Sequence, residues 1–300
     1  LNECDHSQIM DINLDIGRRP EAFLNNKRHF IVNDENKHVT EKQLEKIIKS
    51  IGGYDSFKSD NRAGLPRSLH RISAMKNRQD QIIGLTMRVG RTATGNARII
   101  LDLLMGNKSI LILGEPGSGK TTIIREITRL LAENLNVCIV DTSNEIAGDS
   151  DLPHHCIGYA RRMMVPSLEL QGNIMIECVQ NHTPHVCVID EIGRPREVDA
   201  AKTVRNRGVR IIASAHGDFS KLNKNSQLNG LLGGRTTVIK TGGVASVERL
   251  GEPAFDIIIE ISRNNRNEWR IKTIQSLYRY YSWDIFWKRN CYGQAIVVGI

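Results

Sequence analysis

The sequence predicts an α/β fold in which a mostly parallel β-sheet follows a smaller α+β unit. Three observations support this prediction. Short apolar runs rich in β-branched residues, at 136–141, 185–190 and 209–215, alternate with stretches of helical periodicity. A glycine-rich turn at 114–119 joins another apolar run to a helical pattern. Residues before 96 instead combine one amphipathic helix with strand-like alternation, which is typical of a mixed unit.

The first helix is expected over residues 40–52. Thr40 and Gln43 have the spacing of a capping box, apolar residues follow at helical spacing, and Gly52 ends the pattern. Short strands are expected before it, at 9–17 and 29–34.

A β-hairpin is expected next, formed by 68–75 and 81–89 around the turn 76–80. In its second strand apolar residues alternate with others, and they are Ile83, Leu85, Met87 and Val89. We place the end of this domain near Gly95. The predicted organisation is therefore a small α+β domain at 1–95, a core at 96–275, and a C-terminal tail at 276–300 whose sequence gives no clear pattern.

The core is expected to consist of crossover units, with ligands at the carboxyl ends of its strands. A strand at 110–113 precedes the glycine-rich turn, and helices are expected at 168–181 and 196–207, the latter ended by Gly208. Residues 255–262 and 268–274 are expected to pair as a hairpin.

The glycine-rich turn fits the pattern G-x-x-x-x-G-K-[ST], in which backbone N–H groups cradle phosphates, the lysine reaches the β- and γ-phosphates, and the hydroxyl binds Mg²⁺. Its strand-turn-helix context fits as well. The predicted nucleotide-binding residues are Gly114, Glu115, Pro116, Gly117, Ser118, Gly119, Lys120, Thr121 and Thr122. The expected ligands are a nucleoside triphosphate and Mg²⁺, with Thr121 as one metal ligand.

Two adjacent carboxylates follow the apolar strand 185–189. Asp190 is expected to hold Mg²⁺, and Glu191 to polarise an attacking water. The sequence Asp190–Gly193 also satisfies the D-x-x-G pattern of GTPases, but no N-K-x-D follows anywhere in the chain. We therefore prefer ATP to GTP.

Two further strand ends carry polar residues. His216, after the strand 209–215, is expected to contact the γ-phosphate and respond to its loss, although a lone histidine is often only a satisfied polar residue. Glu145 could assist water or metal, or could belong to a surface loop. The predicted catalytic residues are thus Glu191, Lys120, His216 and Glu145. Phosphoryl transfer usually also needs an arginine, and the sequence does not choose among Arg161, Arg162, Arg194, Arg196, Arg205, Arg207 and Arg235.

Composition is that of an ordinary globular protein, with 40% hydrophobic and 25% charged residues. The net charge of +8 permits an acidic partner without requiring one. Six scattered cysteines without a C-x-x-C pair indicate buried free thiols, and no stretch approaches the roughly 18 apolar residues of a membrane span. A zinc site is disfavoured, because the available ligands lack a finger or ribbon spacing; they are His154, His155, Cys156, His182, His185 and Cys187.

The stretch from Lys58 to Arg98 is strongly basic and could grip nucleic-acid phosphates. Because it lacks aromatic residues for stacking, solvated hairpin faces and a subunit contact are the preferred interpretation.

Five segments together resemble the plastid and cyanobacterial ATPase family related to stage III sporulation protein AA, which is similar to the type II/IV secretion ATPases. They are 67–91, 108–122, 140–149, 175–193 and 213–218. The resemblance implies an AAA/RecA-like P-loop ATPase core behind a small N-terminal domain. It also implies that 213–218 corresponds to the histidine box of secretion ATPases, and that Glu145 falls in their acidic-box region.

The resemblance also bears on location and partners. It implies the plastid stroma, or otherwise a bacterial cytoplasm, and the N-terminus shows no transit peptide. Some relatives carry an Arg-x-x-x-His motif for single-stranded nucleic acid, but here His216 is the last histidine and no such pair occurs.

Three classes of function remain open. We favour an oligomeric mechanochemical ATPase, with a ring as one arrangement, over a single-stranded nucleic-acid-dependent ATPase and over a nucleotide-switched scaffold with little turnover.

Overall fold

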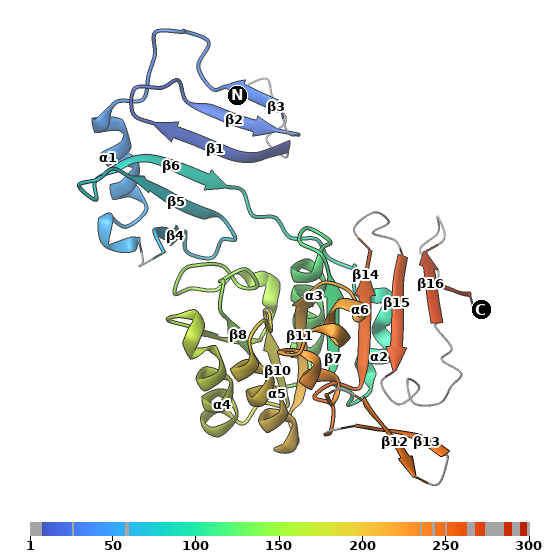
Figure 1. Ribbon diagram of the computed structural model, residues 1–300. Coiled ribbons are helices and arrows are strands. Elements are labelled where there is room, and N and C mark those ends of the chain that lie inside the picture. The colour runs from blue at the N-terminus through green and yellow to red at the C-terminus, as the bar shows by residue number, and fades with distance from the viewer. Residues whose placement is uncertain are drawn as a thin grey trace. The chain divides into compact units, whose positions relative to one another are not determined.

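The computed structural model in Figure 1 describes residues 8–25, 27–57, 60–234, 236–241, 244–249, 251–262, 268–273, 285–289 and 295–298. The chain divides into two compact units. The N-terminal unit comprises residues 1–92 and 147–155, and the core unit comprises 93–146 and 156–300. The segment 147–155 therefore joins the N-terminal unit from within the range expected for the second domain. The boundary near Gly95 stays a prediction.

Six antiparallel strands form the sheet of the N-terminal unit, in the order β3-β2-β1-β6-β5-β4. The strands are β1 (Ile9–Asp15), β2 (Glu21–Leu24), β3 (Lys27–Phe30), β4 (Arg62–Gly64), β5 (Arg71–Lys76) and β6 (Ile82–Arg88). Helix α1 (Glu41–Ser50) lies along this sheet in Figure 1. Its Leu44 and Ile48 pack with Ile72, Ile82 and Leu85, so α1 covers the apolar face of β5 and β6.

Two predictions for this unit are confirmed. The Thr40 side chain accepts the Gln43 N–H, and the Gln43 side chain accepts the Thr40 N–H at 2.9 Å, which is the expected capping box. Strands β5 and β6 pair as the expected antiparallel hairpin.

Ile83 is exposed, although it alternates in the sequence with the buried Leu85. Ile83 is 42% exposed, whereas its neighbour Ile82 is 8% exposed. Pairing shifts from Met75 with Gly84 to Lys76 with Ile82, so the strand β6 has one extra residue at this point. Such a bulge changes which face a side chain occupies, and the alternation of the sequence does not show it.

The expected strand 29–34 is mostly wrong as well, because β3 ends at Phe30. The Ile31 N–H still donates to the Pro20 carbonyl at 2.9 Å. Pro20 has no N–H to return, so the ladder stops there.

The core unit contains the mostly parallel sheet that the sequence predicts. The order of its sheet is β17-β16-β15-β14-β7-β11-β10-β8-β9, in which the six strands from β14 to β9 are parallel. These are β7 (Ile110–Gly114), β8 (Val137–Asp141), β9 (Arg161–Met164), β10 (Val186–Ile189), β11 (Arg210–His216) and β14 (Ile257–Ile261).

Three antiparallel strands extend this sheet beyond β14: β15 (Glu268–Thr273), β16 (Ile285–Arg289) and β17 (Ala295–Val298). The pairing of β14 with β15 confirms the hairpin expected from 255–262 and 268–274. The other two strands lie in the tail, where the sequence shows no pattern. Strands β12 (Thr236–Thr241) and β13 (Val244–Arg249) form a separate antiparallel pair.

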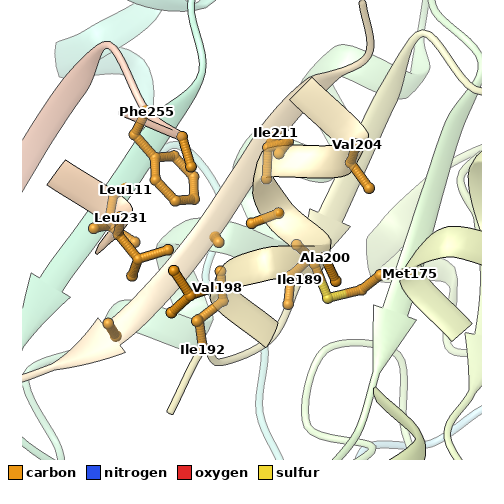
Figure 2. Close-up of a cluster of buried hydrophobic side chains, with 14 of the residues drawn as sticks. Leu111, Met175, Ile189, Ile192, Val198, Ala200, Val204, Ile211, Leu231 and Phe255 are labelled. Atoms are coloured by element: carbon orange, nitrogen blue, oxygen red, sulfur yellow. The ribbon is translucent and has the colours of Figure 1, made fainter. Parts of the chain in front are cut away.

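Helices cover both faces of the parallel sheet. They are α2 (Leu101–Met105), α3 (Lys120–Ala132), α4 (Gln171–His182), α5 (Pro195–Asn206) and α6 (Phe219–Lys224). The expected helix 168–181 starts later, because 168–170 form a 3₁₀ turn. Figure 2 shows side chains of α4 and α5, among them Met175, Val198 and Val204, beside Ile189 and Ile211 of the sheet.

The cysteines of the described core are buried and free, as expected: Cys138, Cys156, Cys178 and Cys187. Cys4 and Cys291 lie outside the described residues. Within the described part of the chain, no helix has the length and apolarity needed to cross a membrane.

Candidate functional site

The glycine-rich turn forms a tight loop between a buried strand and a helix. All five residues of β7 are buried, and α3 begins at Lys120. Gly117 and Gly119 have φ angles of +76° and +99°, conformations that favour glycine. A Cβ on Gly114 would clash with the Ser118 hydroxyl and approach the Ile261 carbonyl. The loop therefore depends on its glycines.

Ser118 is the residue of this loop whose polar group is left unsatisfied. Its side chain is buried, and its Oγ has no hydrogen-bond partner among the described residues. A buried hydroxyl without a partner costs free energy unless a ligand satisfies it. The loop thus holds an unused donor next to a helix N-terminus, where anions are stabilised.

Lys120 is folded back onto this loop. Its Nζ donates to the carbonyls of Gly114 at 2.7 Å and Glu115 at 3.2 Å. Burial lowers the pKa of Lys120, and the carboxylates of Glu191, Glu145 and Asp190 oppose that shift. An anion among the loop N–H groups would favour the charged ammonium further.

His216 joins Lys120 to Glu191. Its Nδ1 lies 3.3 Å from Lys120 Nζ, and its Nε2 lies 3.0 Å from Glu191 Oε1. Because an ammonium can only donate, Nδ1 must accept and the ring proton must reside on Nε2, which then donates to the carboxylate. The strands explain the placement, since the end of β11 pairs with the end of β7 at His216 and Gly114.

The main chain of Asp190 and Glu191 is fixed by two buried side chains. The Ser214 hydroxyl donates to the Asp190 carbonyl at 2.6 Å, and the Gln171 amide donates to the Glu191 carbonyl at 2.6 Å. Neither Ser214 nor Gln171 is among the residues predicted from the sequence. Their signal is weak, because polar residues beside apolar runs are common at strand and helix ends.

Asp190 carries the most perturbed carboxylate of the site. Burial raises its pKa well above the ordinary value, and the negative charges of Asp141, Glu145 and Glu191 raise it further. The Ser143 N–H donates to it and opposes the shift. A divalent cation would relieve this repulsion. Burial removes the carboxylate from water, and a bound cation would supply the positive charge that compensates for the lost hydration.

Glu145 lies on the loop after β8, and its Oε2 is 3.5 Å from the Thr121 hydroxyl, a long contact. Arg125 of α3 holds this loop: its Nε donates to the Ile146 carbonyl at 2.9 Å and its Nη2 to the Glu145 carbonyl at 2.6 Å. Arg125 is not among the residues predicted from the sequence. The available signal is a charged residue among the apolar positions of an otherwise buried helix.

The candidate arginines differ in whether they lie at the amino ends or at the carboxyl ends of the parallel strands. Arg205 forms a double hydrogen bond with Asp256 at 2.7 and 3.0 Å, and Asp256 accepts the N–H of Ser109, just before β7 begins. Arg205 therefore lies at the amino ends of the strands, whereas the glycine-rich loop lies at their carboxyl ends. Arg194 and Arg196 begin α5, directly after the carboxyl end of β10. Arg235 lies outside the described residues.

The remaining candidate metal ligands are not brought together. Among the described residues, no group of three histidine, cysteine or acidic side chains could hold a metal ion. His154 and His155 stack on each other, and His185 Nδ1 accepts the Asn136 N–H at 2.9 Å.

The fold gives the class of the core unit: it has the fold of the RecA-like P-loop ATPases. Two of the solved structures that share this fold illustrate the match. The Legionella pneumophila ATPase DotB matches with a TM-score of 0.53 and 14% identity, over 95% of this chain and 78% of DotB. The pilus retraction motor PilT with bound ADP matches with a TM-score of 0.55 and 13% identity, over 80% of this chain and 77% of PilT.

The chain belongs to the family described as sporulation stage III, protein AA, whose profile matches residues 2–239. Two relatives are each 44% identical over 88% of this chain: ycf45 of Porphyra purpurea and SEEDLING PLASTID DEVELOPMENT 1 of Arabidopsis thaliana. The matches cover 47% and 39% of these relatives, so the chain spans less than half of their length. The family confirms the resemblance seen in the sequence.

Proposed function

We propose that this chain binds ATP with Mg²⁺ at residues 114–122 and hydrolyses ATP. The observation that carries the proposal is the line of contacts from Lys120 through His216 to Glu191, beside the glycine-rich loop. It connects the residue expected at the phosphates to the residue expected at the attacking water. A loop that only bound a nucleotide would not need this connection.

The residues present fit a nucleotide and its metal. The Ser118 hydroxyl has no hydrogen-bond partner among the described residues, and the Lys120 ammonium donates to two backbone carbonyls. With a nucleotide bound, both groups would donate to phosphate oxygens instead. The Thr121 hydroxyl and the Asp190 carboxylate would hold Mg²⁺, which supplies charge neutralisation at the transferred phosphoryl group. Burial and the neighbouring negative charges raise the pKa of Asp190, and a cation bound at this position would offset the repulsion among these charges.

Glu191 is the proposed general base. Its backbone is fixed by Gln171, while its carboxylate is half-exposed and can reach a water molecule. His216 orients this carboxylate through Nε2 and contacts Lys120 through Nδ1. Loss of the γ-phosphate would change the position of Lys120, and His216 would transmit that change to Glu191.

The further parts of the proposal are an oligomer that performs mechanical work, and location in the plastid stroma. PilT is a pilus retraction motor, and the Arabidopsis relative is named for plastid development. Arg194 and Arg196 lie at the start of α5, directly after the carboxyl end of β10, and they are the proposed sources of a transition-state contact in this or a neighbouring subunit.

The first test is steady-state ATP hydrolysis by the full chain, with and without Mg²⁺, across protein concentration. We expect Mg²⁺-dependent turnover that rises as the protein assembles. Addition of single-stranded DNA or RNA at two salt concentrations separates the alternative, because salt-sensitive stimulation would identify a nucleic-acid-dependent ATPase. Absence of turnover together with tight ATP binding would overturn hydrolysis and support a nucleotide-switched scaffold.

A further inference from the structure

The outer face of the N-terminal sheet carries a groove that the proposed ATPase chemistry does not use. It has a volume of about 450 Å³ and is lined by Asp11, Asn13, Phe23, Arg71, Ser73, Thr86 and Arg88. All seven residues lie in the N-terminal unit, on strands β1, β2, β5 and β6. Because side chains alternate along a strand, they occupy the face opposite to the one that α1 covers through Ile72 and Leu85.

Two arginines lie side by side in this groove. Arg71 and Arg88 are direct cross-strand partners in the pairing of β5 with β6. Like charges at directly opposite positions destabilise a sheet unless counter-charges lie nearby. Asp11 supplies one, with a carboxylate oxygen 3.7 Å from Arg88 Nε. The charged side chains that line the groove are thus two guanidinium groups and one carboxylate, and their net positive charge favours an anion.

The next row of the same face carries hydrogen-bond donors. Ser73 and Thr86 are also direct cross-strand partners, and they lie two residues from Arg71 and Arg88 along their strands. Their hydroxyls therefore lie on the same face as the guanidinium groups. Paired arginines with adjacent hydroxyls are the groups that proteins use to bind phosphate oxygens.

The sheet order adds the aromatic side chain that the basic stretch of the sequence lacks. Phe23 of β2 is opposite Asp11 of β1, which in turn is opposite Arg88 of β6. Its ring is accompanied by Arg28, whose guanidinium lies 5.6 Å from the ring centroid. A base can stack on such a ring next to an arginine. Asp11 and the amide oxygen of Asn13 offer acceptors to a base edge, while the Asn13 amide nitrogen donates to Glu21 at 3.1 Å.

From this combination we infer that the groove binds single-stranded nucleic acid, with phosphates at Arg71 and Arg88 and a base on Phe23. The groove is lined by residues of four strands, so an extended strand of nucleotides can lie across them. A plain polyanion would have no use for the aromatic ring and the amide. The inference is independent of ATP hydrolysis at the core unit.

The test is binding of a fluorescent 12-nucleotide RNA or DNA strand to the full chain, measured by anisotropy at several salt concentrations. The groove variant is Arg71→Gln with Arg88→Gln, and its matched control is Lys46→Gln with Arg78→Gln, which removes two exposed charges of the same unit outside the groove. We expect the groove variant to bind at least 10-fold more weakly. The slope of log K against log salt concentration should fall in magnitude by about 1.4, because each phosphate contact to a single strand contributes about 0.7 to that slope. The control should change affinity by less than 3-fold.

A second variant separates stacking from charge. Phe23→Leu keeps the apolar volume but removes the ring, and we expect about 5- to 10-fold weaker binding with an unchanged salt slope. Lys120→Ala should leave binding intact, which excludes the glycine-rich loop as the site. Circular dichroism and basal ATP hydrolysis of the groove variants should equal those of the parent.

Three outcomes would overturn the inference. The first is no binding of either oligonucleotide. The second is equal loss in the groove and control variants, which would indicate only general charge. The third is equal binding of heparin or of vesicles containing anionic lipid, unaffected by Phe23→Leu, which would assign the groove to polyanions or to a membrane surface.

Discussion

His216 Nε2 lies 3.0 Å from Oε1 of Glu191, while the opposite ring nitrogen faces the ammonium of Lys120 at 3.3 Å. The histidine thus contacts both Lys120, which is expected to bind the phosphates, and Glu191, which is expected to bind the attacking water. In the proposed mechanism the ring orients the Glu191 carboxylate through this contact. This relationship makes His216 a positioning residue in the proposed mechanism, and it gives a prediction that differs from that for Glu191.

His216→Ala should lower kcat by about 10- to 100-fold with less than a 3-fold change in KM, because Glu191 loses its orienting partner while the phosphate contacts remain. Steady-state kinetics measure both constants. His216→Asn, which retains an N–H donor, should recover part of the loss. An equal rise of KM in both variants would instead indicate a role in binding.

Glu191→Gln should abolish most of the turnover and preserve ATP binding. A general base contributes about 10²- to 10⁴-fold, and the amide keeps the shape of the side chain without accepting a proton. Single-turnover hydrolysis measures the loss, and binding of a fluorescent ATP analogue serves as the control. Unchanged turnover would remove Glu191 from the mechanism.

Lys120→Ala should weaken ATP binding by at least 10-fold, because the ammonium is the group available to exchange two carbonyl partners for phosphate oxygens. Titration calorimetry with ATP and Mg²⁺ measures the change. Lys224→Ala, at the exposed end of α6, removes the same charge outside the loop and should bind as the parent does. Normal ATP affinity of Lys120→Ala would contradict the assignment of the site.

The sequence predicts those parts of the site that depend on residues close together in the chain, and it does not predict contacts between different strands. The glycine-rich loop, Lys120 and Asp190 could be predicted because their spacing and strand context are local. The contact of His216 with Glu191 could be expected only as two residues on neighbouring strand ends, since the sequence does not give the strand order. The cross-strand pair Arg71 and Arg88 needs the register, and the bulge at Ile83 shows why register cannot be read from alternation alone.

Asp190→Asn should raise the thermal stability of the nucleotide-free protein and remove hydrolysis. The pKa of Asp190 is raised in the folded state, so the folded protein binds the proton more tightly than the unfolded chain. Stability is therefore fully present below the unfolded pKa and falls as pH rises toward the folded pKa. The asparagine escapes this loss, and at pH 8 we expect Tm to rise by about 2–5 °C.

The control for this variant is the pH dependence itself. The Tm advantage of Asp190→Asn over the parent should shrink as pH is lowered toward the raised pKa of Asp190, because the parent then takes up its proton. Addition of Mg²⁺ and ATP should stabilise the parent and not the variant. A Tm advantage that does not depend on pH would show that repacking, rather than charge, causes it.

Arg125→Met should destabilise the core unit and reduce turnover together. Arg125 is buried, and it donates to the carbonyls of Glu145 and Ile146. Methionine fills much of the same volume but donates nothing, so the buried Ile146 carbonyl and the partly buried Glu145 carbonyl lose this donor at a cost of about 2–4 kcal/mol. The loop that carries Glu145 should then lose its fixed position next to Thr121, and kcat should fall even in the molecules that remain folded. Urea unfolding and kinetics at a temperature where both proteins are folded separate the two effects.

Arg196→Met, at an exposed position at the start of α5, is the control for loss of an arginine and should leave the free energy of unfolding within about 0.5 kcal/mol of the parent. If Arg125→Met unfolds at the urea concentration of the parent, Arg125 does not hold the loop, and the position of Glu145 must have another cause.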